Sequence, residues 1–434
     1  MFSSNFQPTI SNQSRRHTAF ALLVAATCVS SAPAQEDNEL AVETWLISDA
    51  FGKEYFQQNG LTGHWFGWRK DLANHGIHPF ATFTGEFLAN VDGGISTGSA
   101  WNGIIDFGIE LNLESLVGWP GASFFTNTYY FRGNDLSSDY VGDFNGVSNI
   151  YTDTDINVFN IFFQQHLFEG KIRMKVGQIA ADDDFMVADN ADVFVNSAFG
   201  TPSLESGNIP APIFPLAAPG AYIHVRAVDG VTLQTAIYAG DAGPVQSNNH
   251  GFSWRAGGGA GWAWFGELGF EYQLVGHGEL TLGGFYATGE FTSFANGSAE
   301  NGLGAVYVQI DHNLLDPKDD PLGLGFFMRG GATPDDTLAT VAASIEAGLV
   351  VEKIIWPTDK FGLGVAHTIF ADDYLNDSRA NGTPVSTTET IIEATYEMPL
   401  AQWLAIQPDL QYIFDPHYSN QDALVLGVRA EMVF

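Results

Sequence analysis

The feature that most constrains the fold of this chain is an alternation of apolar and polar residues with a period of two, repeated in many short segments. The last segment shows apolar residues at every second position: Leu424, Leu426, Val428, Ala430, Met432 and Phe434. Polar residues such as Arg429 and Glu431 lie between them. Because successive side chains of a β-strand point to opposite faces, each segment predicts a strand with one apolar and one polar face. A soluble sandwich and a membrane barrel both produce this pattern.

The composition argues against several other classes of protein. The 50 acidic residues outnumber the 17 basic ones and give a net charge of −33, so nucleic acid is excluded as a natural partner. Hydrophobic residues make up 45% and aromatic residues 13%, far more than a disordered acidic chain contains. After residue 34 the chain has no uncharged apolar run of roughly 18 residues, which excludes membrane-spanning helices. A closed barrel is the remaining way for this apolar sequence to meet lipid.

Residues 1–34 have the features of an export signal peptide. Arg15 and Arg16 precede an apolar stretch at 19–29, and the small residues at 32–34 form a cleavage site. Export by the general route is favoured over the twin-arginine route, because two arginines are a weak match. The single cysteine, Cys28, lies inside this signal, so the exported chain is expected to contain no disulfide. We therefore expect the protein in the outer membrane of a bacterial cell.

The lengths of the connections favour the membrane barrel over the sandwich. About sixteen strands are predicted, at 78–90, 102–114, 121–131, 156–167, 171–180, 220–228, 231–240, 261–273, 279–288, 303–313, 322–330, 340–352, 361–370, 388–398, 402–414 and 422–434. Long connections such as 132–155 and 181–219 alternate with short ones such as 229–230. This asymmetry is typical of a transmembrane antiparallel β-barrel with short periplasmic turns and long extracellular loops. Pro408 lies inside a predicted strand, where a bulge or local break is expected.

The region before the barrel, which is assigned to residues 77–434, divides into two parts. Residues 61–76 predict a short helix on the periplasmic side, with Thr62 as a cap and Gly76 as a stop. Residues 35–60 give no clear signal and are assigned to an N-terminal periplasmic segment.

Several stretches of the chain carry a resemblance to a known family. They are GLTGHWFGWRKDLANHGI (60–77), GWPGASFF (118–125), GDFNGVSNI (142–150), KVGQIAADDDF (175–185), NSAFG (196–200), PLAAPG (215–220), QPDLQYIFDP (407–416) and DALVLGVRAEMVF (422–434). Together they resemble the carbohydrate-selective porins of the OprB family. The resemblance implies a sixteen-stranded barrel that passes sugars passively, and a terminal phenylalanine, here Phe434, that the barrel-assembly machinery reads.

Side chains at the polar positions of each strand are expected to face the lumen, and we call this inward parity. Residues with inward parity are the candidate pore-lining residues. The basic ones are Lys171, Arg173, Lys175, Arg226, Arg329 and Arg429. The acidic ones are Asp106, Glu110, Glu267, Glu271, Glu346, Glu393 and Asp409. Such groups can hydrogen-bond the hydroxyls of small neutral sugars, and Trp403, which has inward parity, can receive an apolar sugar face. Arg226 and Arg329 are the preferred constriction residues. The alternative is that these charges only neutralise one another inside a wet barrel.

Residues 181–219 are too long for a passive connection. We expect this segment to fold into the pore and narrow it, with an exterior flap as the alternative. Its carboxylate run, Asp182 to Asp184, lacks the spaced ligands of a calcium loop, so no metal or cofactor is expected.

Three other functions stay open at this point. The barrel could be a general or cation-preferring diffusion porin, or a structural barrel with a plugged lumen. An outer-membrane hydrolase is disfavoured, because the chain carries no phosphate loop or zinc motif. The expected surroundings are outer-membrane lipid and lipopolysaccharide, and both a monomer and a homotrimer are compatible with the sequence.

Overall fold

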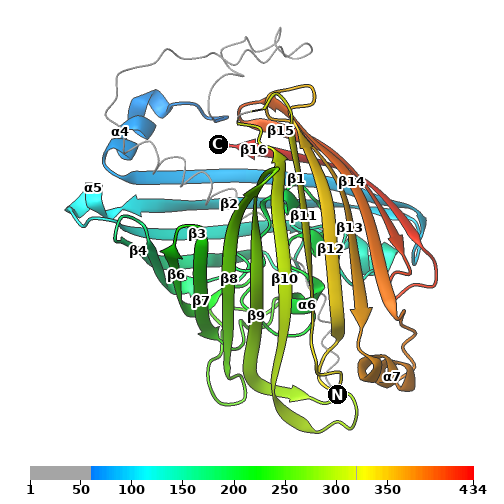
Figure 1. Ribbon diagram of the computed structural model, residues 1–434. Coiled ribbons are helices and arrows are strands. Elements are labelled where there is room, and N and C mark those ends of the chain that lie inside the picture. The colour runs from blue at the N-terminus through cyan, green and yellow to red at the C-terminus, as the bar shows by residue number, and fades with distance from the viewer. Residues whose placement is uncertain (1–59, 319) are drawn as a thin grey trace.

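The fold is a closed antiparallel barrel of sixteen strands, as expected (Figure 1). It is seen in a computed structural model that describes residues 60–434 except Asp319. Each strand pairs with its neighbours in sequence, and β1 closes the ring by pairing with β16. The expected signal peptide at 1–34, and residues 35–59 of the expected periplasmic segment, lie outside the described residues.

The sixteen strands agree closely with the predicted ranges. They are β1 Ile77–Gly93, β2 Gly98–Asn112, β3 Ala122–Gly133, β4 Ile156–Leu167, β5 Ile172–Ile179, β6 Ala218–Val228, β7 Val231–Ala239, β8 Trp262–Leu274, β9 Gly276–Thr292, β10 Ala299–Leu315, β11 Gly323–Ala332, β12 Val341–Glu352, β13 Lys360–Phe370, β14 Thr388–Ala401, β15 Leu404–Phe414 and β16 Ala423–Val433. The short helices outside the strands are η1 Trp65–Gly67, α4 Trp68–Asn74, α5 Leu113–Val117, η2 Ser137–Val141, η3 Asp189–Ala191, η4 Ser197–Phe199, α6 Ser203–Ser206 and α7 Asp372–Ala380.

The two ends of the barrel differ in the length of their connections. We call one the turn end; it carries the segments 113–121, 168–171, 229–230, 275, 316–322, 353–359 and 402–403. We call the other the loop end; it carries 94–97, 134–155, 180–217, 240–261, 293–298, 333–340, 371–387 and 415–422. Figure 1 shows α4 and the C-terminus at the turn end, uppermost, and α7 at the loop end.

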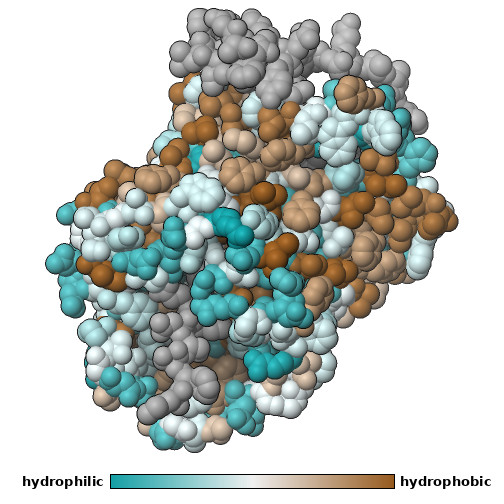
Figure 2. All heavy atoms as spheres, turned by 180° about the vertical axis from the view of Figure 1, so that it is seen from behind, coloured by the Kyte–Doolittle hydropathy of each residue, from teal (hydrophilic) through white to brown (hydrophobic). Residues whose placement is uncertain are grey.

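The apolar face of the alternation lies on the outside of the barrel. In β8 the side chains of Trp262 and Trp264 are 47% and 48% exposed, whereas Phe265 and Glu267 are buried. The outer face thus carries the apolar members of the alternation, and Figure 2 shows hydrophobic residues gathered on the wall. This is the arrangement in which apolar side chains meet lipid and polar ones face the lumen.

One local expectation needs correction. The helix expected over 61–76 is shorter, because Phe66 (φ 57°) and Gly67 (φ 94°) adopt left-handed backbone conformations, and the α-helix begins only at Trp68. At Pro408 the expected local break is confirmed, without a bulge. Strands β14 and β15 have no paired residues between Thr395–Asp409 and Met398–Ile406, although the register is the same on both sides.

The N-terminal helix lies against the end of the last strand. The guanidinium of Arg69 in α4 donates a hydrogen bond to the carbonyl of Phe434, and the amide of Leu61 donates to the carbonyl of Val433 (2.8 Å). Leu61 also packs against Trp403 in the turn between β14 and β15. These contacts hold the helix at the turn end of the barrel.

Candidate functional site: the lumen and its inserted loops

Two loop-end connections fold into the lumen. We call residues 180–217 the long inserted loop and residues 134–155 the second inserted loop. The long inserted loop is almost completely buried; Phe194, Phe199 and Leu204 are 0% exposed. A flap on the outside would be buried on one side only, so the expected folding into the pore is confirmed and the exterior flap is wrong.

An aromatic pair of the long inserted loop packs into a glycine patch on the wall. The rings of Phe194 and Phe199 stack with centroids 4.4 Å apart. They lie over β12 and β13, where Gly348, Gly362 and Gly364 face inward without side chains. A Cβ atom on Gly364 would lie 2.7 Å from Phe194 and 2.8 Å from Phe199. The wall therefore needs glycine at this position to receive the loop.

Charged wall residues hold the backbone of the long inserted loop. Glu393 of β14 accepts hydrogen bonds from the amides of Val195 (2.6 Å) and Asn196 (2.9 Å). Glu267 of β8 accepts one from the amide of Met186 (2.7 Å). Buried carboxylates and backbone amides satisfy each other in this way, so these contacts fix the path of the loop across the lumen.

Arg329, a preferred constriction residue, lies beneath the long inserted loop. It is 1% exposed and donates hydrogen bonds to the carbonyls of Met186 (2.8 Å) and Ala198 (3.0 Å). Its Nε lies 3.3 Å from Glu346. This side chain positions the loop.

The second inserted loop is held by two wall carboxylates. Glu389 of β14 accepts hydrogen bonds from the amides of Phe144 (2.7 Å) and Asn145 (3.0 Å). Glu86 of β1 pairs with Arg429 of β16 (2.6 Å), which also donates to the side chain of Asn149 (2.7 Å). The predicted lining residue Arg429 therefore also contacts an inserted loop.

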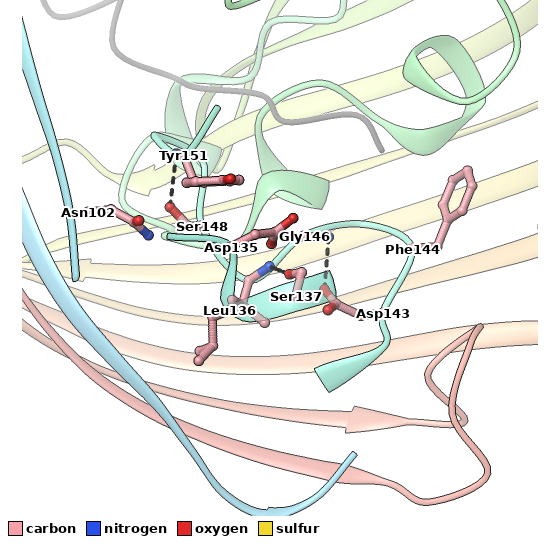
Figure 3. A pocket seen from close by; sticks show the side chains of 10 residues that line it. Asn102, Asp135, Leu136, Ser137, Asp143, Phe144, Gly146, Ser148 and Tyr151 are labelled. Atoms are coloured by element: carbon pink, nitrogen blue, oxygen red, sulfur yellow. Dashed lines mark hydrogen bonds between the residues drawn. The ribbon is translucent and has the colours of Figure 1, made fainter. Parts of the chain in front are cut away.

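The second inserted loop is stabilised further by its own side chains. Figure 3 shows Asp143 accepting a hydrogen bond from the amide of Gly146 (2.8 Å). Ser137 accepts one from the amide of Val147 (3.0 Å). These residues surround a small cavity beside Asn102 of β2. Burial and the nearby Glu389 carboxylate raise the pKa of Asp143 to about 8.

A cluster on β5 and β6 contains two of the predicted basic residues. The Nζ of Lys175 lies 2.8 Å from the carboxylate of Asp184, and Arg173 lies 3.0 Å from the same carboxylate. Arg173 also donates to the hydroxyl of Tyr222 (2.7 Å). Burial tends to raise the pKa of Asp184, but the charges of Lys175 and Arg173 bring that pKa below its ordinary value.

The remaining predicted residues lie in separate places. Asp106 is buried and accepts a hydrogen bond from Asn127 of β3 (3.0 Å). Glu110 and Arg226 lie near the turn end of their strands, and the Arg226 side chain is exposed. Trp403 was predicted to point into the lumen from within a strand, but β15 begins at Leu404 and Trp403 lies in the preceding turn.

Glu86, Glu389 and the glycine patch were not among the predicted site residues. Glu86 and Glu389 have inward parity in their strands, so parity could have included them. The glycines carry no side chain and give no such signal. Their role follows only from the position of Phe194 and Phe199 above them.

The sequence contains one Gly-x-Ser-x-Gly stretch, at Gly94 to Gly98. Ser96 lies in the short connection between β1 and β2, and its carbonyl accepts a hydrogen bond from Asn90 (2.9 Å). A hydrolase places this serine at a turn from strand to helix. Here the turn joins two strands, so the stretch does not form a nucleophile elbow.

Within residues 60–318 and 320–434, no helix is both long and apolar enough to cross a bilayer. No group of three or more His, Cys, Asp and Glu side chains in them is arranged to hold a metal ion.

Known proteins with similar sequences and structures identify the family of this chain. Residues 98–434 match the family described as carbohydrate-selective porin, OprB family. The chain is 26% identical to Porin B of Pseudomonas aeruginosa, over 90% of this chain and 95% of that protein. It is 21% identical to the putative porin QuiX of Acinetobacter baylyi, over 86% of this chain and 93% of that protein. The high-pH structure of Pseudomonas putida OprB shares the fold, with a TM-score of 0.78 and 21% identity over 87% of this chain and 99% of that one.

Proposed function

Because this chain belongs to the OprB family of carbohydrate-selective porins and is therefore an outer-membrane channel, we propose that its long inserted loop forms the constriction that selects sugars. The observation that supports this proposal is the path of the loop. It is held by Glu267 of β8, Arg329 of β11 and Glu393 of β14, and Phe214 packs against Tyr129 of β3 with ring centroids 5.3 Å apart. A loop tied to several sectors of the wall narrows the passage between them.

The predicted lining residues divide into two roles under this proposal. Arg329, Arg429 and Glu267 position the inserted loops through the hydrogen bonds described above. Arg173 also contacts the long inserted loop through Asp184, so Arg226 is left to face the passing solute. Charged groups of this kind can hydrogen-bond the hydroxyls of a small neutral sugar.

The placement of the chain in the cell is part of the same proposal. The turn end faces the periplasm and the loop end faces the outside, as the connection lengths favour. Residues 1–34 direct export, and Phe434 is the residue that the assembly machinery reads. The outer wall contacts lipid and lipopolysaccharide. Mass measurement in detergent distinguishes a monomer from a homotrimer.

Shortening the long inserted loop tests the constriction. Replacing residues 190–212 by a short Gly-Ser linker is expected to raise single-channel conductance several-fold and to admit larger oligosaccharides in liposome swelling, because conduction follows the narrowest cross-section. The control removes residues 254–259, which belong to a different loop-end connection, 240–261. It is expected to leave both measurements unchanged.

Unchanged conductance after the 190–212 replacement would show that this loop does not form the constriction. Swelling rates of the unmodified protein that depend only on solute size, with no preference for sugars over amino acids, would favour the general diffusion porin.

A further inference from the structure

The lumen faces of β5 and β6 concentrate positive charge, although the chain as a whole carries a net charge of −33. We define the basic row as Lys171, Arg173, Lys175 and Arg226. Alternate residues of β5 supply Arg173 and Lys175, and Lys171 continues the row into the turn. The backbone amide of Arg226 donates a hydrogen bond to the carbonyl of Lys171 (2.8 Å). Four of the 17 basic residues therefore share one small area of the wall.

Histidines extend this area on both sides. The register places His166 of β4 opposite Arg173, and Arg173 opposite His224 of β6. The aromatic ring of Tyr222 lies beneath the row, 5.1 Å from the Arg173 guanidinium and 5.3 Å from the Lys175 ammonium. The row is thus a set of nitrogen donors fixed on neighbouring strands.

The positive charge of the basic row is only partly balanced. Its ion pairs go to one carboxylate, Asp184, which Lys175 and Arg173 share. The side chains of Lys171 and Arg226 form no ion pair or hydrogen bond within residues 60–318 and 320–434. The acids in the flanking turns, Glu169 and Asp229, also form no ion pair there. Two cationic side chains of the row, Lys171 and Arg226, therefore have no carboxylate in contact with them.

The basic row also contains an unused buried donor. The Nε of Arg173 is buried and donates to no acceptor among the described residues. Arg429, by contrast, donates to Glu86 through both Nε (3.0 Å) and Nη2 (2.6 Å). Unused donors are therefore not a general property of the inward-facing arginines. A buried donor without an acceptor costs free energy unless a ligand or water satisfies it.

We propose that the basic row is a binding station for an oxyanion, the carboxylate or phosphate of a small hydrophilic solute moving through the lumen. Arginine presents a planar set of N–H donors that fits two oxygens of such a group, and the lysines add point charges. The fixed charges on the wall of a narrow lumen raise the local concentration of the anion. This inference goes beyond neutral-sugar transport and depends only on an aqueous lumen.

Current block in planar bilayers tests the station. Gluconate and glucose 6-phosphate, added in low salt, are expected to block the single-channel current of the intact protein more strongly than glucose does. They should act at lower concentration from the turn end, where the row lies. The Arg226→Gln variant is expected to weaken both blocks by about tenfold, the effect of one lost charge-assisted hydrogen bond. High salt should reduce the block by screening.

The matched control is Lys318→Gln, which removes one positive charge from a turn between β10 and β11 at the same end. It is expected to leave the block unchanged. Equal weakening by the two variants would show that only the net charge of the rim matters and would overturn the proposal. So would the absence of block by both anions in the intact protein. Folding of each variant is checked by its heat-dependent migration in detergent.

Discussion

The wall of β11–β16 and the basic row on β5 and β6 use the same residue types in different ways. In the first region, Arg329 and Arg429 meet acceptors from the inserted loops and from neighbouring carboxylates. In the second, Arg226 is exposed and has no such partner among the described residues. Inward parity is common to all three arginines. What separates Arg329 and Arg429 from Arg226 is contact with an inserted loop.

Adding a side chain to the glycine patch is expected to have the largest effect on the wall of β11–β16, where the inserted loops are held. Gly364→Val is expected to push Phe194 and Phe199 off the wall, because even a Cβ atom there would lie 2.7 Å from the first ring. Overpacking of this kind costs about 1–3 kcal/mol, so the melting temperature should fall and conductance should become higher and noisier. Gly259→Val is the control, because an added Cβ there meets nothing within 4 Å. A normal melting temperature and conductance in Gly364→Val would show that the glycine patch does not hold Phe194 and Phe199.

Two buried glutamates, one with and one without hydrogen bonds to its carboxyl group, test how much single hydrogen bonds stabilise the inserted loop. Glu393→Ala leaves the amides of Val195 and Asn196 without their acceptor, which should lower the free energy of unfolding by about 2 kcal/mol. Glu205 in α6 is equally buried, yet neither of its two carboxyl oxygens has a hydrogen-bond partner in the described part of the chain. Burial raises the pKa of Glu205 well above its ordinary value.

Glu205→Ala therefore removes a carboxyl group of the same size without removing a hydrogen bond, and the variant should unfold at the same denaturant concentration as the parent or a higher one. Chemical unfolding of both variants in detergent gives the two free energies. Equal losses in both would show that side-chain volume, and not hydrogen bonding to the loop, determines the result.

The smallest expected effect concerns pH and the second inserted loop. Burial and the Glu389 carboxylate raise the pKa of Asp143 to about 8, so the folded protein holds a proton there that the unfolded chain loses near its ordinary value of 3.8. The stabilisation is complete below that ordinary value and is lost as the pH rises through about 8.

Asp143→Asn should consequently melt a few degrees above the parent protein at pH 9 and lose this advantage at pH 4. Melting curves of both proteins across this range provide the measurement. Asp139→Asn, at an exposed position of this loop, is the control. A difference in melting temperature that does not change with pH would show that titration of Asp143 does not cause it.

The sequence by itself determined the barrel. The period of two is a short-range property, so most strands and their apolar faces could be predicted from a few neighbouring residues, as for Trp262 and Trp264. The alternation is weak at 121–131 and 156–167, and there the sequence left the facing open. The outward positions also fixed the inward set, including Arg329, Arg429 and Glu267. It misplaced only local features at strand and helix ends, such as Trp403 and the start of α4.

Only the tertiary structure decided what the inward residues do. Glu393 and Val195 are 198 positions apart in the chain, and no local pattern joins them. The same holds for the glycines beneath Phe194 and Phe199, whose signal is the lack of a side chain. The path of a loop across a lumen depends on long-range packing against several strands at once. Parity therefore predicts which residues face the lumen, and the folded loop determines which of them remain available to a solute.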